Sequence, residues 1–388
     1  MPPPPRDWIL VCGGFHRVGG MDRLNASLAL FLASRGTRVH LVGHDIDPEV
    51  AAAPGIAVTR VARPAGAFLL GEVALARAAG RLRREMMASG RAPLLLGNGG
   101  NADRADVNWV HSVHHAWPCA DAGAPAWFRA KNRAFKTWSR RREAPAIRDA
   151  AVVIANSRRT KADLLAHLPQ LDAGRTHVVY PGSDPAWRPP DARARVEARA
   201  RWCGNVDRPL VAMIGALGHD VNKGIDVVLD AWRRLASTRD WDAELVVAGP
   251  GDTSRWRACA SGMDVRFTGH ISEAGSLLDA ADLLVSPVRY EAYGLAVHEA
   301  ICRGVPVLVS RGAGIVERFP PGADEFLLDG ADGAQLAARL TAWRASAGSH
   351  AVPVEQLGAR LRAHSLDDMC ADIVAAAEAP ADPLGAPA

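Results

Sequence analysis

The feature that most constrains the fold is a repeated order of short apolar segments, glycine-rich loops and helical periodicity. The apolar segment Trp8–Cys12 is followed by glycines at positions 13, 14, 19 and 20, and then by leucines at helical spacing over Asp22–Arg35. Gly36 ends this helix, and Thr37–Val42 is a second apolar segment. Strand, glycine-rich loop, helix and strand in this order are typical of the start of a doubly wound parallel sheet.

The same order occurs a second time further along the chain. Leu210–Ile214 predicts a buried strand, Gly215 and Gly218 follow it, and Ile225–Leu235 has the period of a helix. Since 388 residues fit two domains of about 100–200 residues each, we expect an α/β protein with two doubly wound halves. Further short strands are expected at Ala57–Val61, Pro93–Leu96, Val107–Val110, Ala151–Ala155, His177–Tyr180, Leu245–Ala248, Val265–Gly269, Leu283–Ser286 and Val305–Val309.

The proline-rich stretch Pro185–Pro190 marks the expected end of the first half. We therefore expect an N-terminal domain over residues 1–190 and a C-terminal domain over residues 191–364, with Asp191–Trp202 as a connecting helix. Residues 365–388 are expected to form a C-terminal helix that packs back toward the N-terminal domain, followed by an Ala- and Pro-rich disordered tail.

Charge, cysteines and apolar runs limit the class of protein. The net charge of +4 is mild for 388 residues; it excludes nothing and weakly favours anionic partners such as phosphates or an acidic membrane surface. The six cysteines are dispersed and form no C-x-x-C pair, which predicts free thiols in a reducing compartment. Neither a signal peptide nor an apolar run of about 18 residues is present, so we expect a cytoplasmic protein.

The segment Ser286–Ser310, SPVRYEAYGLAVHEAICRGVPVLVS, carries the most chemical information. Seven residues separate Glu291 from Glu299, and Gly294 lies between them where a helix is expected to begin. The free N–H groups of a helix N-terminus attract a diphosphate, and glycine lets it approach the backbone. A carboxylate one turn later can accept hydrogen bonds from the hydroxyls of a ribose. The carboxylate of Glu291 would then face whatever the diphosphate carries.

This segment closely resembles the donor-site signature of glycosyltransferase family four, the retaining group 1 glycosyltransferases. Other stretches resemble the same family in the same order, and together they extend over most of the chain. They are Gly19–Asp22, Ala155–Ser157, Tyr180–Asp184, Asn222–Gly224, Gly249–Gly251 and Phe267–His270. The resemblance implies the GT-B fold, in which two Rossmann-like domains face a central cleft, the first on the acceptor side and the second binding a nucleotide sugar.

The resemblance also implies site residues. The catalytic candidates are Lys223, Glu291 and His111, with His114 as the second choice for the histidine. A lysine stabilises the diphosphate leaving group, and a neutral imidazole can hydrogen-bond a sugar hydroxyl. The residues expected to bind the donor are Gly19, Gly20, Asn222, Lys223, Gly249, Gly269, His270, Glu291, Tyr293, Gly294, Leu295 and Glu299.

One position departs from the family pattern. Ala216 stands where the family has a phosphate-binding arginine, so two alternatives are open: this phosphate contact is absent, or His219, Asn222 or Arg17 supplies it. Asp45-Ile46-Asp47 is similar to a metal-binding Asp-x-Asp motif but lies far in sequence from the donor segment, and a loop carboxylate pair is the favoured interpretation. We expect no metal and no other cofactor, with transfer that retains the anomeric configuration.

Trp127–Arg142 contains seven Lys or Arg residues, four aromatic residues and no acidic residue. A peripheral contact with the inner face of a membrane is one interpretation, and an ordinary solvated helix packed on its domain is the other. Nucleic-acid binding is a third interpretation, which the sequence supports least.

The sequence thus predicts a retaining hexosyltransferase of polysaccharide biosynthesis that transfers from a nucleotide diphosphate sugar to a glycan, lipid-linked or small-molecule acceptor. The alternatives are a non-catalytic nucleotide-sugar-binding module and a sugar-nucleotide epimerase of similar architecture. An epimerase would change the donor sugar without an acceptor.

Overall fold

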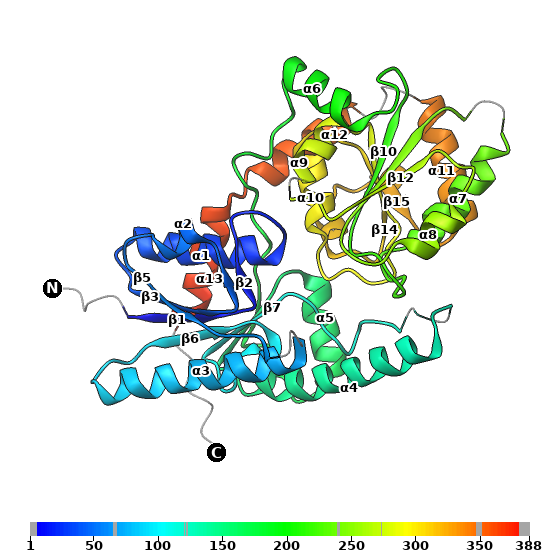
Figure 1. Cartoon of the computed structure of the whole chain (residues 1–388). Coiled ribbons are helices and arrows are strands. Elements are labelled where there is room, and N and C mark those ends of the chain that lie inside the picture. Colours follow the sequence, from blue (N-terminus) through cyan, green and yellow to red (C-terminus); the bar gives the residue numbers. More distant parts are fainter. Residues whose placement is uncertain are drawn as a thin grey trace. The chain divides into compact units, whose positions relative to one another are not determined.

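The computed structural model describes residues 6–64, 68–119, 121, 123–238, 241–272, 274–346 and 351–379. The chain divides into two compact units (Figure 1). Unit 1 comprises residues 1–117, 133–182 and 366–388, and unit 2 comprises residues 118–132 and 183–365. The chain passes from unit 1 to unit 2 after Gly182, a few residues before the boundary expected at residue 190.

Unit 1 is built on a parallel sheet with the strand order β5-β3-β1-β6-β7-β8-β9. The strand order reverses between β1 and β6. All four residues of β1 pair in parallel with β6 on one side and with β3 on the other. The central strands are short and almost fully buried, because helices cover both faces of a doubly wound sheet, whereas the edge strand β5 is partly exposed. Their bounds are β1 Trp8–Val11, β3 Val39–Gly43, β5 Ile56–Arg60, β6 Leu94–Gly97, β7 Val107–Val110, β8 Val152–Ala155 and β9 Thr176–Val178.

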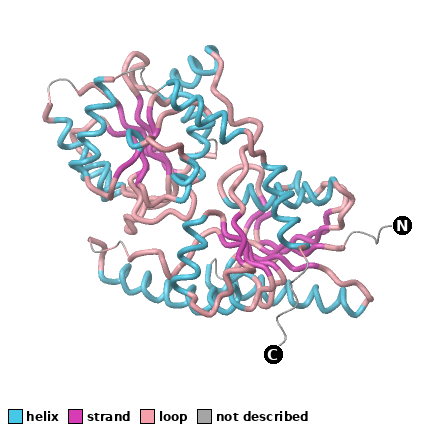
Figure 2. Tube along the Cα trace, turned by 180° about the vertical axis from the view of Figure 1, so that it is seen from behind, coloured by secondary structure: helices cyan, strands magenta, loops and turns pink. Residues whose placement is uncertain are grey.

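The helices of unit 1 surround this sheet (Figure 2). The long helix α4 begins in unit 2 and belongs to unit 1 from Arg133 onward. The C-terminal helix α13 packs against α1 and β8. Two very short strands, β2 and β4, form a separate pair that the sequence did not predict. The bounds are β2 Gly14–Phe15, α1 Met21–Ser34, β4 Asp45–Ile46, α2 Pro48–Ala51, α3 Phe68–Ala88, α4 Ala126–Arg148, α5 Arg158–His167 and α13 Leu366–Glu378.

Unit 2 repeats the design with the parallel order β12-β11-β10-β13-β14-β15. The strand order reverses between β10 and β13, so the loops that follow these two strands leave the sheet side by side. The strand bounds are β10 Leu210–Ile214, β11 Glu244–Ala248, β12 Val265–Gly269, β13 Leu283–Ser286, β14 Val307–Ser310 and β15 Leu327–Leu328. Only β15 was not expected from the sequence.

The core of unit 2 lies between this sheet and helices that include α7 and α11, and Trp232 is one of its largest fully buried side chains. Helix α10 packs against β13, β14 and α12. The helix bounds are α6 Ala192–Trp202, α7 Ile225–Ala236, α8 Ser254–Cys259, α9 Ala274–Ala280, α10 Leu295–Cys302, α11 Gly333–Ala345 and α12 Ala351–Arg362. Among the described residues, 3-10 segments lie at Gly99–Asn101, Gly314–Arg318 and Asp324–Phe326.

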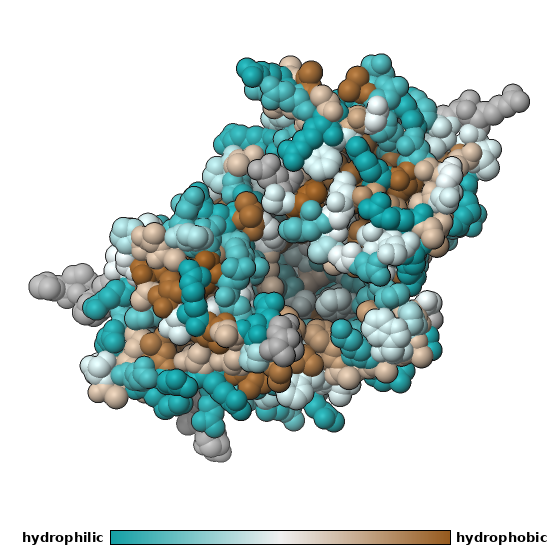
Figure 3. Space-filling model, viewed as in Figure 1, coloured by the Kyte–Doolittle hydropathy of each residue, from teal (hydrophilic) through white to brown (hydrophobic). Residues whose placement is uncertain are grey.

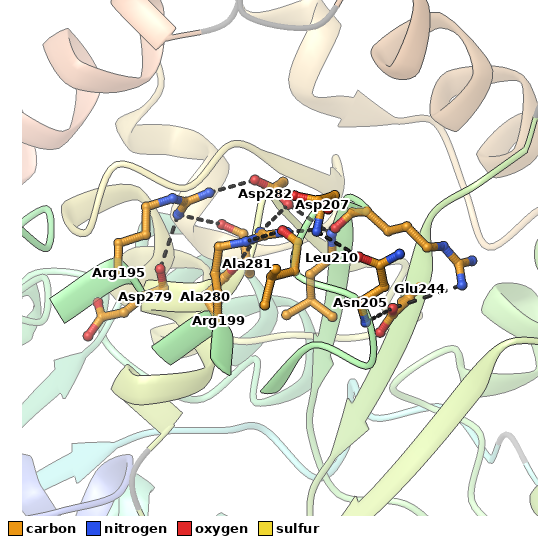
Figure 4. Close-up of polar contacts among 12 residues, drawn as sticks. Arg195, Arg199, Asn205, Asp207, Leu210, Glu244, Asp279, Ala280, Ala281 and Asp282 are labelled. Carbon is orange, nitrogen blue, oxygen red and sulfur yellow. Dashed lines mark hydrogen bonds and ion pairs between the residues drawn. The ribbon is translucent and has the colours of Figure 1, made fainter. Parts of the chain in front are cut away.

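A network of arginines and carboxylates joins α6 to the amino ends of β10 and β13 (Figure 4). Asp282 accepts hydrogen bonds from Arg195 at 2.6 Å, from Arg199 at 2.9 Å and from the backbone N–H of Leu210 at 2.8 Å. Arg199 also donates to the carbonyls of Ala280 and Arg208. The network therefore holds α6 at the amino ends of the strands, which is the end of the sheet away from the loops that follow β10 and β13.

We expect Asp282→Asn to lower the free energy of unfolding of unit 2 by about 2 kcal/mol, because two guanidinium groups and a strand N–H lose a charged acceptor. Chemical denaturation measures this loss. The control is Glu197→Gln, whose carboxylate is 63% exposed and pairs with Arg193; it should change stability by less than about 0.5 kcal/mol. Equal stability of the two variants would contradict a structural role for the network.

Candidate active site

Lys223 and Glu291 form the charged centre of the candidate site in unit 2. The Lys223 ammonium group makes an ion pair with the Glu291 carboxylate across 68 residues of sequence. The two side chains are 31% and 22% exposed, so both remain accessible to a ligand. Lys223 follows β10 and Glu291 follows β13, which are the strands at the reversal of strand order. Ligands of doubly wound sheets bind at this position.

The aliphatic part of the Lys223 side chain packs over Gly215, the residue directly after β10. A Cβ atom at Gly215 would lie 3.2 Å from the Cγ atom of Lys223, so the glycine leaves room for the lysine. Gly224 then begins α7 with a φ of 78°, and a Cβ there would overlap the carbonyl oxygen of Pro287. These two glycines let the loop 215–224, which carries Lys223 and is called the lysine loop below, lie directly against the end of β13.

Asn222 and Arg289 join the two loops. Asn222 Nδ2 donates to the carbonyl of Tyr290 at 2.9 Å, and the N–H of Arg289 donates to the carbonyl of Asn222 at 2.8 Å. The Arg289 guanidinium makes two hydrogen bonds to the Asp226 carboxylate, at 2.9 and 2.7 Å. Asn222 was predicted to bind the donor directly, but only 5% of it is exposed and its amide holds the Glu291 loop in place. Arg289 was missed, although it stands within the signature segment.

Glycines of unit 2 allow three loops to approach one another closely. Gly249 has a φ of 150°, and a Cβ there would overlap the carbonyl oxygen of Gly215. Gly251 has the same relation to the carbonyl of Leu217, whose N–H donates to the carbonyl of Pro250 at 2.7 Å. The N–H of Gly249 donates to the carbonyl of Gly269 at 2.9 Å. Of the predicted donor-binding residues, Gly249 and Gly269 are therefore joined by a hydrogen bond, and His270 beside them is exposed.

Helix α10 begins as the sequence predicts. Gly294 is its N-cap residue with a φ of 116°, and Leu295 is the first helical residue. The first N–H groups of this helix have no partner in the helix itself, and they form an anion-binding end. Glu299 lies one turn further and accepts a hydrogen bond from Arg303 at 3.0 Å. Arg303 also contacts Asp279 at 2.8 Å, so the orientation of Glu299 is fixed.

Tyr293 is a correction to the predicted donor-binding residues. Its side chain is only 2% exposed, and its hydroxyl lies 3.1 Å from Nδ1 of the fully buried His298. The other ring nitrogen of His298 lies 2.8 Å from the hydroxyl of Ser183, which donates to the carbonyl of Leu361. The side chain of Tyr293 therefore supports α10 from the core and does not face a ligand.

The burial of His298 predicts acid sensitivity. Burial, with smaller contributions from Arg318 and His364, lowers the pKa of His298 to about 3. Between that value and the usual 6.5, the unfolded state binds the extra proton, so stability falls as the pH falls below about 6.5. At pH 5 the loss from this group is roughly 2 kcal/mol.

Urea unfolding at pH 7.5 and pH 5 checks this expectation for unit 2. His298→Asn should be less stable at pH 7.5, because it loses hydrogen bonds, and should lose less stability on acidification than the native protein. An unchanged loss on acidification would contradict the assignment to His298.

The predicted residues of unit 1 lie in loops that follow β2 and β7. Gly19, with a φ of 99°, and Gly20, the N-cap residue of α1, are both exposed. The backbone carbonyl of His111 accepts a hydrogen bond from Asn156 at 3.1 Å. Burial lowers the pKa of His111 to about 3, and its Nε2 atom is buried without a hydrogen-bond partner. The His111 imidazole is therefore neutral.

The predicted replacements for the missing phosphate contact beside Ala216 have other partners. Arg17 makes an ion pair with Glu49 in unit 1. His219 lies in unit 2 with Nδ1 at 3.3 Å from the Arg255 guanidinium. Asp47 of the Asp-x-Asp sequence caps α2 by accepting from the N–H of Glu49 at 2.9 Å, and Asp45 lies 3.3 Å from His16. These carboxylates thus have local structural partners.

The basic aromatic segment forms the first part of α4. In the part of α4 that belongs to unit 1, the side chains of Lys136, Ser139 and Glu143 are buried, whereas those of Arg133, Trp138 and Arg141 are exposed. In the part of the chain that the structure describes, no helix combines the length and apolar character needed to cross a membrane.

Comparison with known proteins assigns both halves of the chain to related families. The model described as Glycosyltransferase Family 4 matches residues 18–187, and the model described as Glycosyl transferases group 1 matches residues 208–344. The D-inositol 3-phosphate glycosyltransferase of Xylanimonas cellulosilytica is 31% identical over 365 residues, which cover 82% of each chain.

Two solved structures have a similar fold over most of the chain. WaaG, a glycosyltransferase involved in lipopolysaccharide biosynthesis, has a TM-score of 0.72 at 19% identity over 96% of this chain and 99% of its own. Anabaena HepE, solved in complex with UDP and glucose, has a TM-score of 0.68 at 16% identity over 95% of this chain and 98% of its own. The predicted fold class, two Rossmann-like α/β domains of the GT-B type, is confirmed.

Proposed function

The chain belongs to the group 1 and family 4 glycosyltransferases, and from this we propose that it is a retaining, metal-independent hexosyltransferase that uses the site in unit 2 for its donor. Its reaction class is glycosyl transfer from a nucleotide sugar. The finer proposals concern the stereochemistry, the absence of a metal and the acceptor.

The observation that carries the proposal is the ion pair of Lys223 with Glu291 at the reversal of strand order. The diphosphate would bind between the ammonium group of Lys223 and the N-terminus of α10 at Gly294. The ribose would reach Glu299 one turn further along the helix, and the sugar would lie toward Glu291. Lys223 stabilises the negative charge that develops on the diphosphate as the glycosidic bond breaks.

Retention follows if the acceptor attacks on the face from which the diphosphate leaves. Glu291 forms an ion pair with Lys223, which suits it to hold donor hydroxyls better than to act as a nucleophile. A phosphate oxygen of the departing diphosphate would then take the proton of the acceptor hydroxyl. The new glycosidic bond forms as the bond to the diphosphate breaks, and the proton leaves with the nucleotide.

Metal independence rests on the charges available at the site. One ammonium group and one helix end face the position proposed for the diphosphate.

The acceptor is a hydroxyl compound of the glycan, lipid-linked or small polyol class. The relative named a D-inositol 3-phosphate glycosyltransferase makes a phosphorylated polyol the first probe acceptor to use. The test supplies UDP-, GDP- and ADP-hexoses with D-inositol 3-phosphate and methyl hexosides, with and without a chelator. Proton NMR of the product then gives the anomeric configuration.

We expect an α-linked product from an α-linked donor at an unchanged rate in the chelator. An inverted product, or a rate abolished by chelator and restored by Mg²⁺, would overturn the corresponding part of the proposal. Conversion of the donor sugar to its epimer without nucleotide release would favour the epimerase alternative. Donor binding without turnover would favour a binding module.

We also propose a peripheral contact of unit 1 with the inner face of an anionic membrane, through one side of α3 and α4. Figure 3 shows hydrophobic residues beside strongly hydrophilic ones over these helices. Phe68 and Leu70 are 52% and 48% exposed at the start of α3, and Phe68 lies beside Phe135 of α4 at a ring distance of 5.7 Å. Trp138 is 39% exposed on the face of α4 that carries Arg141. Basic residues beside exposed aromatics suit an anionic interface.

Sedimentation with phosphatidylglycerol vesicles tests this contact. Phe68→Asp should weaken binding at least tenfold, because an apolar anchor becomes an anion next to anionic lipid. Val196→Asp, at a residue that is 68% exposed on α6 of unit 2, is the matched control and should bind as the native protein does. Equal binding of the two variants, or no binding by the native protein, would overturn the membrane contact.

A further inference from the structure

The loop after β7 holds a second histidine, His114, in a single orientation. Glu143 of α4 accepts two hydrogen bonds from this residue, from its backbone N–H at 3.0 Å and from its ring Nδ1 at 2.8 Å. Arg140 Nε donates to the His114 carbonyl at 3.0 Å. The backbone and one ring nitrogen of His114 are therefore fixed by the same helix.

Two aromatic rings limit rotation of the His114 ring. Trp117 stacks on it at a centroid distance of 6.1 Å, and Phe135 meets it edge-on, also at 6.1 Å. The side chain of His114 is 18% exposed, and that of Glu143 is 3% exposed. Burying a carboxylate costs free energy unless hydrogen bonds compensate for the lost water. The Oε2 atom of Glu143 accepts both of its hydrogen bonds from His114. Its other oxygen, Oε1, is buried without a hydrogen-bond partner.

The hydrogen bond to Glu143 determines which nitrogen of His114 carries the proton. A carboxylate accepts and does not donate, so Nδ1 carries the proton of this hydrogen bond, and in the neutral ring that tautomer leaves the lone pair on Nε2. A histidine held in this way presents an acceptor at a fixed position, as carboxylate–histidine pairs do at metal sites. His111, three residues earlier, differs because its Nε2 atom is buried.

We propose that Glu143 is a positioning residue that fixes His114 so that its Nε2 atom accepts a hydrogen bond from the hydroxyl group of the sugar or polyol acceptor. This rests on the proposed function. His114 follows a strand of a doubly wound sheet at its carboxyl end, where such sheets bind ligands. His114, and not His111, is then the histidine of unit 1 that contacts the acceptor.

A double-mutant cycle tests the coupling of the two residues. His114→Ala should lower kcat/KM for the methyl hexoside or D-inositol 3-phosphate probe about 100-fold, and Glu143→Gln about 10-fold. The double variant should be no worse than His114→Ala, because Glu143 acts only through His114. Effects that multiply in the double variant would overturn the proposal, since a structural role of Glu143 does not depend on His114.

Nitrogen NMR of the protein with ¹⁵N-labelled histidine gives a readout that does not depend on activity. The signals of His114, assigned by their loss in His114→Ala, should show a protonated Nδ1 and an unprotonated Nε2 near pH 8. Glu143→Gln should shift them toward a mixture of the two tautomers. Glu244→Gln is the matched control, because Glu244 is a second buried carboxylate, 6% exposed, and lies in unit 2. A native His114 protonated at Nε2 would overturn the proposal.

Donor binding separates this proposal from the proposed function. Calorimetry with the nucleoside diphosphate should give the same affinity, within twofold, for the native protein and for both single variants, because the nucleotide is proposed to bind at Lys223 and the N-terminus of α10. A native protein that neither binds nor uses any donor would contradict the proposed function. The tautomer of His114 would still decide whether Glu143 positions it.

Discussion

Lys223→Ala is expected to lower kcat by about 100- to 1,000-fold, because the departing diphosphate loses the ammonium group that stabilises its charge. The same change leaves the Glu291 carboxylate without its cation. An unpaired carboxylate then repels the anionic donor, so donor affinity should fall as well. Steady-state rates of nucleoside diphosphate release, with calorimetry of donor binding, measure the two effects separately.

Arg233→Ala provides the matched control for Lys223. Arg233 is a cation of unit 2 on the helix that follows the lysine loop, but its side chain is 57% exposed and pairs only locally with Asp230. Its removal lowers the net charge by the same amount and should change kcat less than twofold. If the two variants lost activity equally, general charge and not the position of Lys223 would explain the effect.

Gly249→Ala is expected to abolish donor binding and to destabilise unit 2 by at least about 4 kcal/mol. The added methyl group would overlap the carbonyl oxygen of Gly215, which is backbone and cannot rotate away. The φ of 150° at Gly249 is also unfavourable for any residue with a Cβ atom. Thermal unfolding and calorimetric titration with the nucleoside diphosphate measure both losses.

Two other glycines separate steric overlap from backbone strain. Gly218 has a φ of 141° but open space around it, so Gly218→Ala should cost about 1–2 kcal/mol from strain alone. Gly330 has neither a positive φ nor a neighbour within 4 Å, so Gly330→Ala should be neutral. A Gly249→Ala protein as stable as Gly218→Ala would show that the loop yields, which contradicts the close packing inferred there.

Local patterns predicted the fold because strands, glycines and helices of a doubly wound sheet are encoded by neighbouring residues. The start of α10 at Gly294 is one case, since the φ of 116° at this position strongly favours glycine. The short strands β2, β4 and β15 were missed because two residues give no period to detect.

Side-chain roles were harder to predict than elements. Tyr293 and Glu299 lie in the same signature, yet only the structure shows that the tyrosine faces the core and bonds His298. Asn222 was predicted to contact the donor, and its contact with the carbonyl of Tyr290 depends on two loops that are distant in sequence. The pairing of Glu143 with His114 likewise joins a helix and a loop with no shared sequence pattern.

The most direct test of the central claim is nucleoside diphosphate release from a panel of UDP-, GDP- and ADP-hexoses by the native protein and Lys223→Ala, with chelator present and with Arg233→Ala as control. We predict that one donor supports slow release alone and faster release with an acceptor, that chelator has no effect, and that Lys223→Ala loses at least 100-fold. Release that is equal in Lys223→Ala and the native protein would contradict the placement of the diphosphate at Lys223 and α10.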